Sequence, residues 1–278
     1  MATINCRGRL VDLAEPKVMA IVNVTPDSFY SGSRCLSTNA ALARADEALA
    51  QGADIFDLGA YSTRPGAAEV SEDEEWARLE PVVSELRRRH PQAIISIDTF
   101  RSSVAERAIE AGADIINDVS GGTLDEQMIA TVARLQVPYI LMHMRGTPAT
   151  MQQHTNYNNL VADVIAELSQ QLRRLTDAGV HDVIIDPGFG FAKTLEQNYE
   201  LFAHLQEFSV FGLPLLVGIS RKSMIYKLFD ITPEQSLCAT TALNMLALRD
   251  GASILRVHDV PEAAQVVRMW GMMRVGLK

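Results

Sequence analysis

A recurring glycine constrains the fold of this chain more than any other sequence feature. At four places a helical pattern ends in glycine and a short apolar run follows directly, at Gly52, Gly112, Gly179 and Gly251. Glycine suits the left-handed residue just past a helix, and β-branched residues suit a strand. These joints lie roughly 60 to 70 residues apart, about the length of two strand–helix units. The pattern predicts a regular alternation of helices and strands.

Apolar runs bounded by turn residues predict eight strands. They span residues 18–24, 54–59, 94–98, 114–119, 138–143, 183–186, 215–219 and 253–257. The runs are nearly continuous rather than alternating, as expected when both faces of a parallel strand are covered. Eight such strands separated by helices in about 250 residues predict a single (β/α)8 TIM barrel. A doubly wound open sheet is the alternative.

Three local features refine this expectation. Residues 4–13 are expected to form a short N-terminal β-hairpin over the barrel floor. Ser71 and Glu74 have the spacing of a capping box at the start of a helix, and Pro81 is expected to kink or split that helix. Since no linker-like segment interrupts the series, residues 1–278 are expected to form one domain.

Composition excludes several classes of protein. The 278 residues are 47% hydrophobic and 21% charged, as in ordinary globular proteins. The net charge of −9 argues against a nucleic-acid partner, although local cations can still bind a small anion. Three scattered cysteines support neither a disulfide framework nor a thiolate zinc site. The first residues do not resemble a secretory signal and no apolar run would span a membrane, so a cytoplasmic location is expected.

Polar residues follow each expected strand. In a barrel of this kind, catalytic groups come from the carboxyl ends of the strands and the loops after them. In chain order the strand ends carry Asn23, Arg64, Asp98, Asn117, His143, Asp186, Lys222 and His258. Taken singly, each has a simpler explanation, since a carboxylate can cap a helix and a histidine can be buried. Arg221 and Arg256 could likewise pair with acids at the rim. Their joint occurrence at one end of a barrel favours an active site.

Two chemical sets stand out among these residues. Asp98, Asn117 and Asp186 could bind the adjacent N–H donors and amide-like edge of a flat heterocycle. The cations Arg64, Lys222, Arg256 and His258 suit a phosphate or pyrophosphate, and Gly218 would let the backbone approach it. Together they predict a polar heterocyclic substrate with an anionic leaving group.

Two other ligand classes are not supported. The run Asp186-Pro187-Gly188-Phe189-Gly190-Phe191 lacks the spacing of dinucleotide-binding and P-loop motifs. His143 and His154 do not have the spacing of a zinc-binding helix.

Five motifs in order resemble the dihydropteroate synthase family of folate biosynthesis, over about residues 19–260. They are Asn23-Val24-Thr25-Pro26-Asp27-Ser28-Phe29, Ser62-Thr63-Arg64-Pro65-Gly66, Asp186-Pro187-Gly188-Phe189-Gly190-Phe191, Ser220-Arg221-Lys222-Ser223 and Arg256-Val257-His258-Asp259. The resemblance implies condensation of (7,8-dihydropterin-6-yl)methyl diphosphate with p-aminobenzoate, releasing pyrophosphate. It also implies that the reaction requires Mg²⁺ and that the chain forms a homodimer through residues 235–249 and 263–273. Sulfonamides are expected to target such an enzyme.

The resemblance further implies roles for individual residues. The pterin diphosphate would contact Thr63, Asp98, Asn117, Met142, Asp186, Gly218, Lys222, Arg256 and His258. The p-aminobenzoate would contact Thr63, Arg64, Pro65, Phe191, Lys222 and Ser223. Asn23 would hold Mg²⁺, and the catalytic residues would be Lys222, Arg256, His258 and Asp98. Loops 25–35 and 62–70 would close over the substrates.

The chain departs from the family pattern in both loops. Ser31 and Ser33 replace a carboxylate and a glycine, and Tyr61 stands where many relatives carry glutamate. Ser31 and Ser33 motivate an alternative, a catalytically weak pterin-binding paralogue. A pterin-dependent methyltransferase on a related barrel is the second alternative, but it has no need of the cationic motifs.

Overall fold

The eight predicted strands form one parallel sheet that is closed into a barrel. The computed structural model describes residues 3–24, 33–61 and 69–276. The strands are β3 (Lys17–Asn23), β4 (Ile55–Gly59), β5 (Ile94–Asp98), β6 (Ile115–Asp118), β7 (Tyr139–Met142), β8 (Val183–Asp186), β9 (Leu216–Val217) and β10 (Ile254–Val257). Their order is β8-β7-β6-β5-β4-β3-β10-β9, and a parallel bridge between Ile185 and Leu215 joins the two edges. The predicted barrel is confirmed, and the open doubly wound sheet is excluded.

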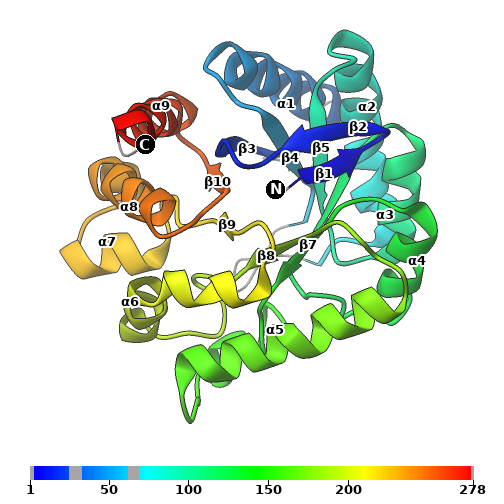
Figure 1. Cartoon of the computed structure of the whole chain (residues 1–278). Helices are drawn as coiled ribbons and strands as arrows, with labels where there is room; N and C mark the ends of the chain where they lie inside the picture. Colours follow the sequence, from blue (N-terminus) through cyan, green and yellow to red (C-terminus); the bar gives the residue numbers. More distant parts are fainter. Residues whose placement is uncertain (1–2, 25–32, 62–68, 277–278) are drawn as a thin grey trace.

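Helices alternate with the strands and surround them (Figure 1). They are α1 (Ser33–Ala50), α2 (Glu72–Arg89), α3 (Ser102–Glu110), α4 (Met128–Leu135), α5 (Leu160–Asp177), α6 (Leu195–Ala203), α7 (Ser223–Phe229), α8 (Leu237–Arg249) and α9 (Val260–Gly276). Three short 3-10 helices lie at Met151–Gln153, Leu205–Phe211 and Pro233–Ser236. In the described part of the chain, no helix combines the length and apolarity that a membrane crossing needs.

The glycine joints have the predicted geometry. Gly52, Gly112, Gly179 and Gly251 have φ angles of 101°, 112°, 89° and 105°. Each glycine allows the chain to turn from a helix into the next strand. Its backbone conformation is one that residues with a Cβ rarely adopt.

The N-terminal hairpin closes the floor of the barrel, as predicted. Strands β1 (Thr3–Cys6) and β2 (Arg9–Asp12) are antiparallel and lie across one end of the barrel (Figure 1). The hairpin and the residue after it contribute four buried side chains, Ile4, Cys6, Val11 and Leu13. These pack with one residue from each barrel strand: Met19, Ile55, Ile94, Ile115, Ile140, Ile184, Leu216 and Ile254. The amino ends of the strands are therefore sealed by apolar contacts, which leaves the carboxyl ends for polar chemistry.

Of the kink or split expected at Pro81, the split does not occur. Helix α2 runs without interruption through Pro81, and its buried face includes Leu79, Val82 and Val83. Packing of this face outweighs the one backbone hydrogen bond that proline cannot donate. Half of the predicted capping box is present, because Ser71 Oγ accepts a hydrogen bond from Glu74 N at 3.2 Å. The Glu74 carboxylate pairs with Arg78.

The floor can be tested within the hairpin. Replacing Ile4, which is 1% exposed, by alanine removes a side chain packed into the floor and should lower the free energy of unfolding by about 2–5 kcal/mol. Leu10→Ala is the matched control, since Leu10 is 73% exposed on the same hairpin and should change stability by less than about 0.5 kcal/mol. Urea unfolding measures both, and equal effects would contradict the packed floor.

Candidate functional site

The three residues predicted to bind a heterocycle lie at the carboxyl ends of nearby strands. Asp98 ends β5 and is directly opposite Asn117 on β6. Asp186 ends β8 and is opposite Met142 on β7. Asn117 and Asp186 are buried, and Asp98 is partly buried. The strand register thus brings residues from distant parts of the sequence to the same end of the barrel.

Asp57 is the centre of a buried polar cluster that sequence analysis missed. It lies within β4 and is fully buried. Its carboxylate accepts hydrogen bonds from Ser96 Oγ at 2.7 Å, Asn117 Nδ2 at 3.0 Å and Arg256 Nε at 2.6 Å. A carboxylate inside an otherwise apolar strand was the available signal, because such a group is rarely buried without partners.

Arg256 joins the two predicted chemical sets. Its guanidinium donates from Nε to Asp57 and from Nη2 to Asp98 Oδ2, each at 2.6 Å. Residue chemistry grouped Arg256 with the anion-binding cations, and the family resemblance also implied a contact with the pterin diphosphate. In the structure Arg256 pairs with Asp98 of the heterocycle-binding set. Burial opposes the charge on Arg256, but Asp57 and Asp98 raise its pKa above the ordinary value. Burial likewise raises the pKa of Asp98 to about 7, while Arg256 acts in the opposite direction.

Lys222 and Phe191 come together as predicted. The Lys222 ammonium donates to the Phe189 carbonyl and lies 4.7 Å from the centre of the Phe191 ring. Burial lowers the pKa of Lys222 to about 8, and the nearby Asp186 opposes this shift. Ser223 follows as the first residue of α7. At Gly190 a Cβ would lie 3.1 Å from Lys222 Cδ, so the loop backbone needs glycine to come this close.

The remaining described site residues lie around this group. Gly218 is beside Arg256, whose Cβ would be 3.7 Å from a Cβ built on the glycine. The His258 backbone N–H and its ring Nδ1 are each 3.1 Å from Ser220 Oγ. Met142 is buried in a small apolar cluster against which Phe191 also packs. Asn23 is exposed at the end of β3.

Several predicted site residues fall outside the described part of the chain. They are Ser31, Thr63, Arg64 and Pro65, together with most of loops 25–35 and 62–70. Their predicted roles therefore remain predictions.

Arg221 and His143 have the simpler roles considered for them. Arg221 forms a two-point ion pair with Asp259, with N–O distances of 3.0 and 2.6 Å. His143 is buried, with Nε2 3.0 Å from Glu167 Oε2 and Nδ1 3.1 Å from the Lys193 ammonium. Burial lowers the pKa of His143 to about 4, and Lys193 acts in the same direction.

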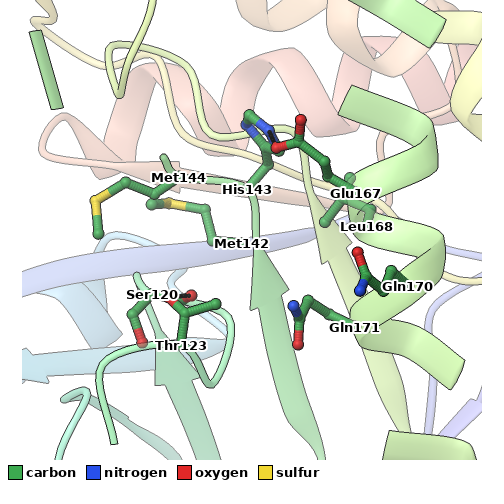
Figure 2. Close-up of a pocket in the computed structure, with 9 residues that line it drawn as sticks. All are labelled: Ser120, Thr123, Met142, His143, Met144, Glu167, Leu168, Gln170 and Gln171. Atoms are coloured by element: carbon green, nitrogen blue, oxygen red, sulfur yellow. Dashed lines mark hydrogen bonds and ion pairs between the residues drawn. The ribbon is translucent and has the colours of Figure 1, made fainter. Parts of the chain in front are cut away.

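A cavity of about 180 Å³ lies beside this histidine, between α5 and the loops that follow β6 and β7. Figure 2 shows His143 and Glu167 pointing toward each other at its edge. It is lined by Ser120, Thr123, Met142, His143, Met144, Glu167, Leu168, Gln170 and Gln171. Met142 connects it to the site, but Asp57, Asp98 and Arg256 are not part of its lining.

Comparisons with known proteins show the family to which the chain belongs. The family of pterin binding enzymes matches residues 19–258. Dihydropteroate synthase of Escherichia coli strain K12 is 43% identical over 266 residues, covering 95% of this chain and 93% of that protein. The chain belongs to the dihydropteroate synthase family.

Solved structures of this family superpose closely on the barrel. Yersinia pestis dihydropteroate synthase with a sulfonamide drug complex has a TM-score of 0.91 and 41% identity, covering 98% of this chain and 99% of that chain. The Xanthomonas albilineans enzyme in complex with 7,8-dihydropteroate has a TM-score of 0.87 and 34% identity, covering 99% of both chains. The family and fold expected from the sequence are therefore confirmed.

The departure from the family pattern at Tyr61 lies within the described residues. Tyr61 packs edge-on against Phe100, with ring centres 5.2 Å apart, and lies 5.3 Å from the Arg101 guanidinium. The aromatic ring thus takes part in a local stack in place of a carboxylate.

The buried His143 predicts a specific pH dependence of stability. Its pKa falls from 6.5 to about 4, so protonation favours the unfolded chain. The contribution of neutral His143 to the free energy of unfolding is fully present above about pH 6.5. It decreases by on the order of 3 kcal/mol as the pH falls toward 4. The neighbours of His143 titrate mainly outside this pH range. The pKa of Glu167 is lowered to about 2, so its effect on stability lies at lower pH, and the pKa of Lys193 is lowered to about 7, so its effect lies at higher pH. The guanidinium of Arg145 stays charged throughout the range.

Urea unfolding at pH 7 and pH 4.5 tests this expectation. The wild type should lose more stability between the two pH values than His143→Gln, which has no imidazole to titrate. An equal loss in the two proteins would show that His143 is not buried in its neutral form.

Proposed function

We propose that this chain is a dihydropteroate synthase, which joins (7,8-dihydropterin-6-yl)methyl diphosphate to p-aminobenzoate and releases pyrophosphate. The observation that carries the proposal is the hydrogen-bonded cluster of Asp57, Asp98, Asn117 and Arg256. It lies at the carboxyl ends of the strands in a chain that matches members of this family over nearly its full length. A cluster of acids and one planar cation suits a pterin ring, which presents several N–H donors along one edge.

Asp98, Asn117 and Asp186 would hold the edge of the pterin. Asp186 Oδ1 accepts a hydrogen bond from Gly188 N at 2.8 Å, which fixes the orientation of its carboxylate. Asp98 is held by Arg256 in the structure. When the pterin binds, its donors would share the Asp98 carboxylate with Arg256, while Asp57 would keep the guanidinium in place. Arg256 could then stack on the ring through its planar face.

The cations would stabilise the departing diphosphate. Arg256 and His258 would contact it, and Asn23 would hold Mg²⁺ through its amide oxygen. An amide oxygen is the type of ligand that Mg²⁺ binds, and the described residues contain no group of three or more His, Cys, Asp or Glu side chains placed to hold a metal. Asn23 is exposed at the barrel rim, so phosphate oxygens and water could complete the coordination. When bound, Mg²⁺ would offset negative charge on the leaving diphosphate.

The second substrate would bind between Phe191, Lys222 and Ser223, with Thr63, Arg64 and Pro65 closing the pocket. A dissociative substitution at the exocyclic CH2 group suits this arrangement. The C–O bond to diphosphate breaks, the electron-rich dihydropterin shares the positive charge, and the arylamine attacks and then loses a proton. Positioned cations act here by electrostatic stabilisation. A sulfonamide would compete for the same pocket.

The assay that tests this function is pyrophosphate release. It should require the dihydropterin diphosphate and p-aminobenzoate together and should match the amount of dihydropteroate formed. Tight binding of the dihydropterin diphosphate without turnover would favour the pterin-binding paralogue instead. Transfer of a methyl group from tetrahydrofolate to a corrinoid would favour the methyltransferase.

Asp98→Ala should strongly weaken binding of the dihydropterin diphosphate. Loss of a buried, hydrogen-bonded charge costs about 2–5 kcal/mol, so calorimetry should register a dissociation constant raised at least about thirtyfold. Asp73→Ala is the control, because the Asp73 side chain is 95% exposed. Unchanged affinity in Asp98→Ala would disprove the assigned pterin site.

Lys222→Ala should weaken binding of both substrates, because its ammonium interacts electrostatically with Asp186 and lies 4.7 Å from the centre of the Phe191 ring. About a tenfold loss for each is expected from a charged hydrogen-bond donor. Lys227→Ala, at an exposed lysine on α7, should leave both affinities unchanged. A loss confined to one substrate would contradict the shared position.

A homodimer and a cytoplasmic location also remain predictions. Val266 is buried and Leu243 is partly buried against the barrel core, so packing within the chain explains them. Leu246 and Met269 are 37% and 52% exposed on α8 and α9, and they are available to a second copy. Size-exclusion chromatography with light scattering measures the oligomeric state.

A further inference from the structure

A buried lysine outside the predicted site holds the loop that carries Phe191, one of the predicted site residues. Lys193 is 3% exposed and follows the loop 187–191. Its ammonium lies 3.0 Å from the Gly188 carbonyl, 3.0 Å from the Phe191 carbonyl and 3.1 Å from His143 Nδ1. An ammonium has three donors and no acceptor, so all three donors have a partner here.

The partners of Lys193 are themselves fixed. Because the ammonium can only donate, His143 Nδ1 must accept, and the imidazole proton is on Nε2. That proton is donated to Glu167 Oε2, and Glu167 also pairs with Arg145 (Figure 2 shows the His143–Glu167 contact). Arg145 lies 3.9 Å from the centre of the Tyr157 ring, and Tyr157 donates to the Ala192 carbonyl next to Lys193. The chain of contacts therefore returns to the loop from which it began.

The loop needs these donors because its backbone is tightly folded. Gly188 and Gly190 have φ angles of 73° and 80°, and Ala192 has a φ of 50°. A Cβ on Gly188 would lie 2.0 Å from the His143 carbonyl oxygen, so the loop is pressed against the end of β7. A left-handed alanine costs about 1 kcal/mol or more and persists only where its surroundings impose it. Lys193 and Tyr157 bind the carbonyls on either side of that strained position.

The same loop presents the proposed p-aminobenzoate pocket on its other face. Phe189 accepts the hydrogen bond from Lys222, and Phe191 places its ring beside the Lys222 ammonium. We propose that Lys193 is a positioning residue for p-aminobenzoate, which acts by fixing loop 187–191 and through it Phe191 and Lys222. This inference rests on the proposed function. Burial lowers the pKa of Lys193 to about 7, which reflects the cost of removing its ammonium from water. Hydrogen bonds from all three N–H donors offset this cost.

The variant Lys193→Met tests the role, because it keeps a long side chain and removes the donors. The KM for p-aminobenzoate should rise at least about tenfold, since a displacement of about 1 Å in a pocket has effects of this size or larger. The dissociation constant for the dihydropterin diphosphate should rise by a smaller factor, because Asp98 and Asn117 do not depend on this loop, whereas Asp186 and Lys222 contact it. Lys227→Met is the matched lysine control. Equal losses for the two substrates, or no loss, would overturn the proposal.

His143→Ala provides a second route that keeps both loop carbonyl contacts. It should raise the KM for p-aminobenzoate in the same direction but by less. In the double variant the increase should be no larger than in Lys193→Met alone, because the histidine acts through the lysine. If the increases in KM from the two single variants multiplied in the double variant, His143 would not act through Lys193.

Hydrogen exchange of the loop amides separates failure of this inference from failure of the proposed function. Lys193→Met should speed exchange in loop 187–191, where Gly190 N is held by Asn198 Oδ1 at 2.6 Å. This measurement needs no substrate. A wild-type protein that makes no dihydropteroate would refute the function, whereas unchanged exchange would refute the positioning role.

Discussion

Closure of a parallel sheet is the constraint on which the rest of this structure depends. When eight parallel strands join into a ring, all their carboxyl ends meet at one rim. The bridge between Ile185 and Leu215 completes that ring with a strand, β9, of only two residues. The opposite rim is filled by one apolar side chain from each strand and by the hairpin. Polar chemistry is thus confined to a single end by packing.

At that end, the central interaction is an ion cluster with more acid than base. Arg256 pairs with Asp57 and Asp98, which come from β4 and β5. Asp57 is fully buried and is also held by Ser96 and Asn117, so it serves as the fixed partner. Asp98 is the more accessible of the two carboxylates. The two acids therefore have different roles. Asp57 orients the guanidinium, whereas Asp98 can be shared with a substrate.

The sequence was sufficient where local pattern and fold agree. Strand positions were predicted to within one or two residues because the apolar runs and glycine joints are local signals. Asp98, Asn117 and Asp186 were found because they terminate such runs. Asp57 was missed because it lies inside an apolar run, and its partner Arg256 is 199 residues away in sequence. Lys193 was missed because only the folded chain places His143 beside it. The helix was not split at Pro81 because tertiary packing outweighed a local backbone preference.

The floor of the barrel also has a consequence for how the chain reaches its fold. The hairpin is the first structured segment in the sequence, yet its apolar side chains pack against a layer that includes Ile254 from the last strand. During synthesis the hairpin would emerge before β10 and would wait for that strand before the surface against which it packs is complete. Such contacts between chain ends are costly to form early, because a long loop must close first. Burial of Ile4 and Val11 would therefore be a late event that couples the two ends of the chain.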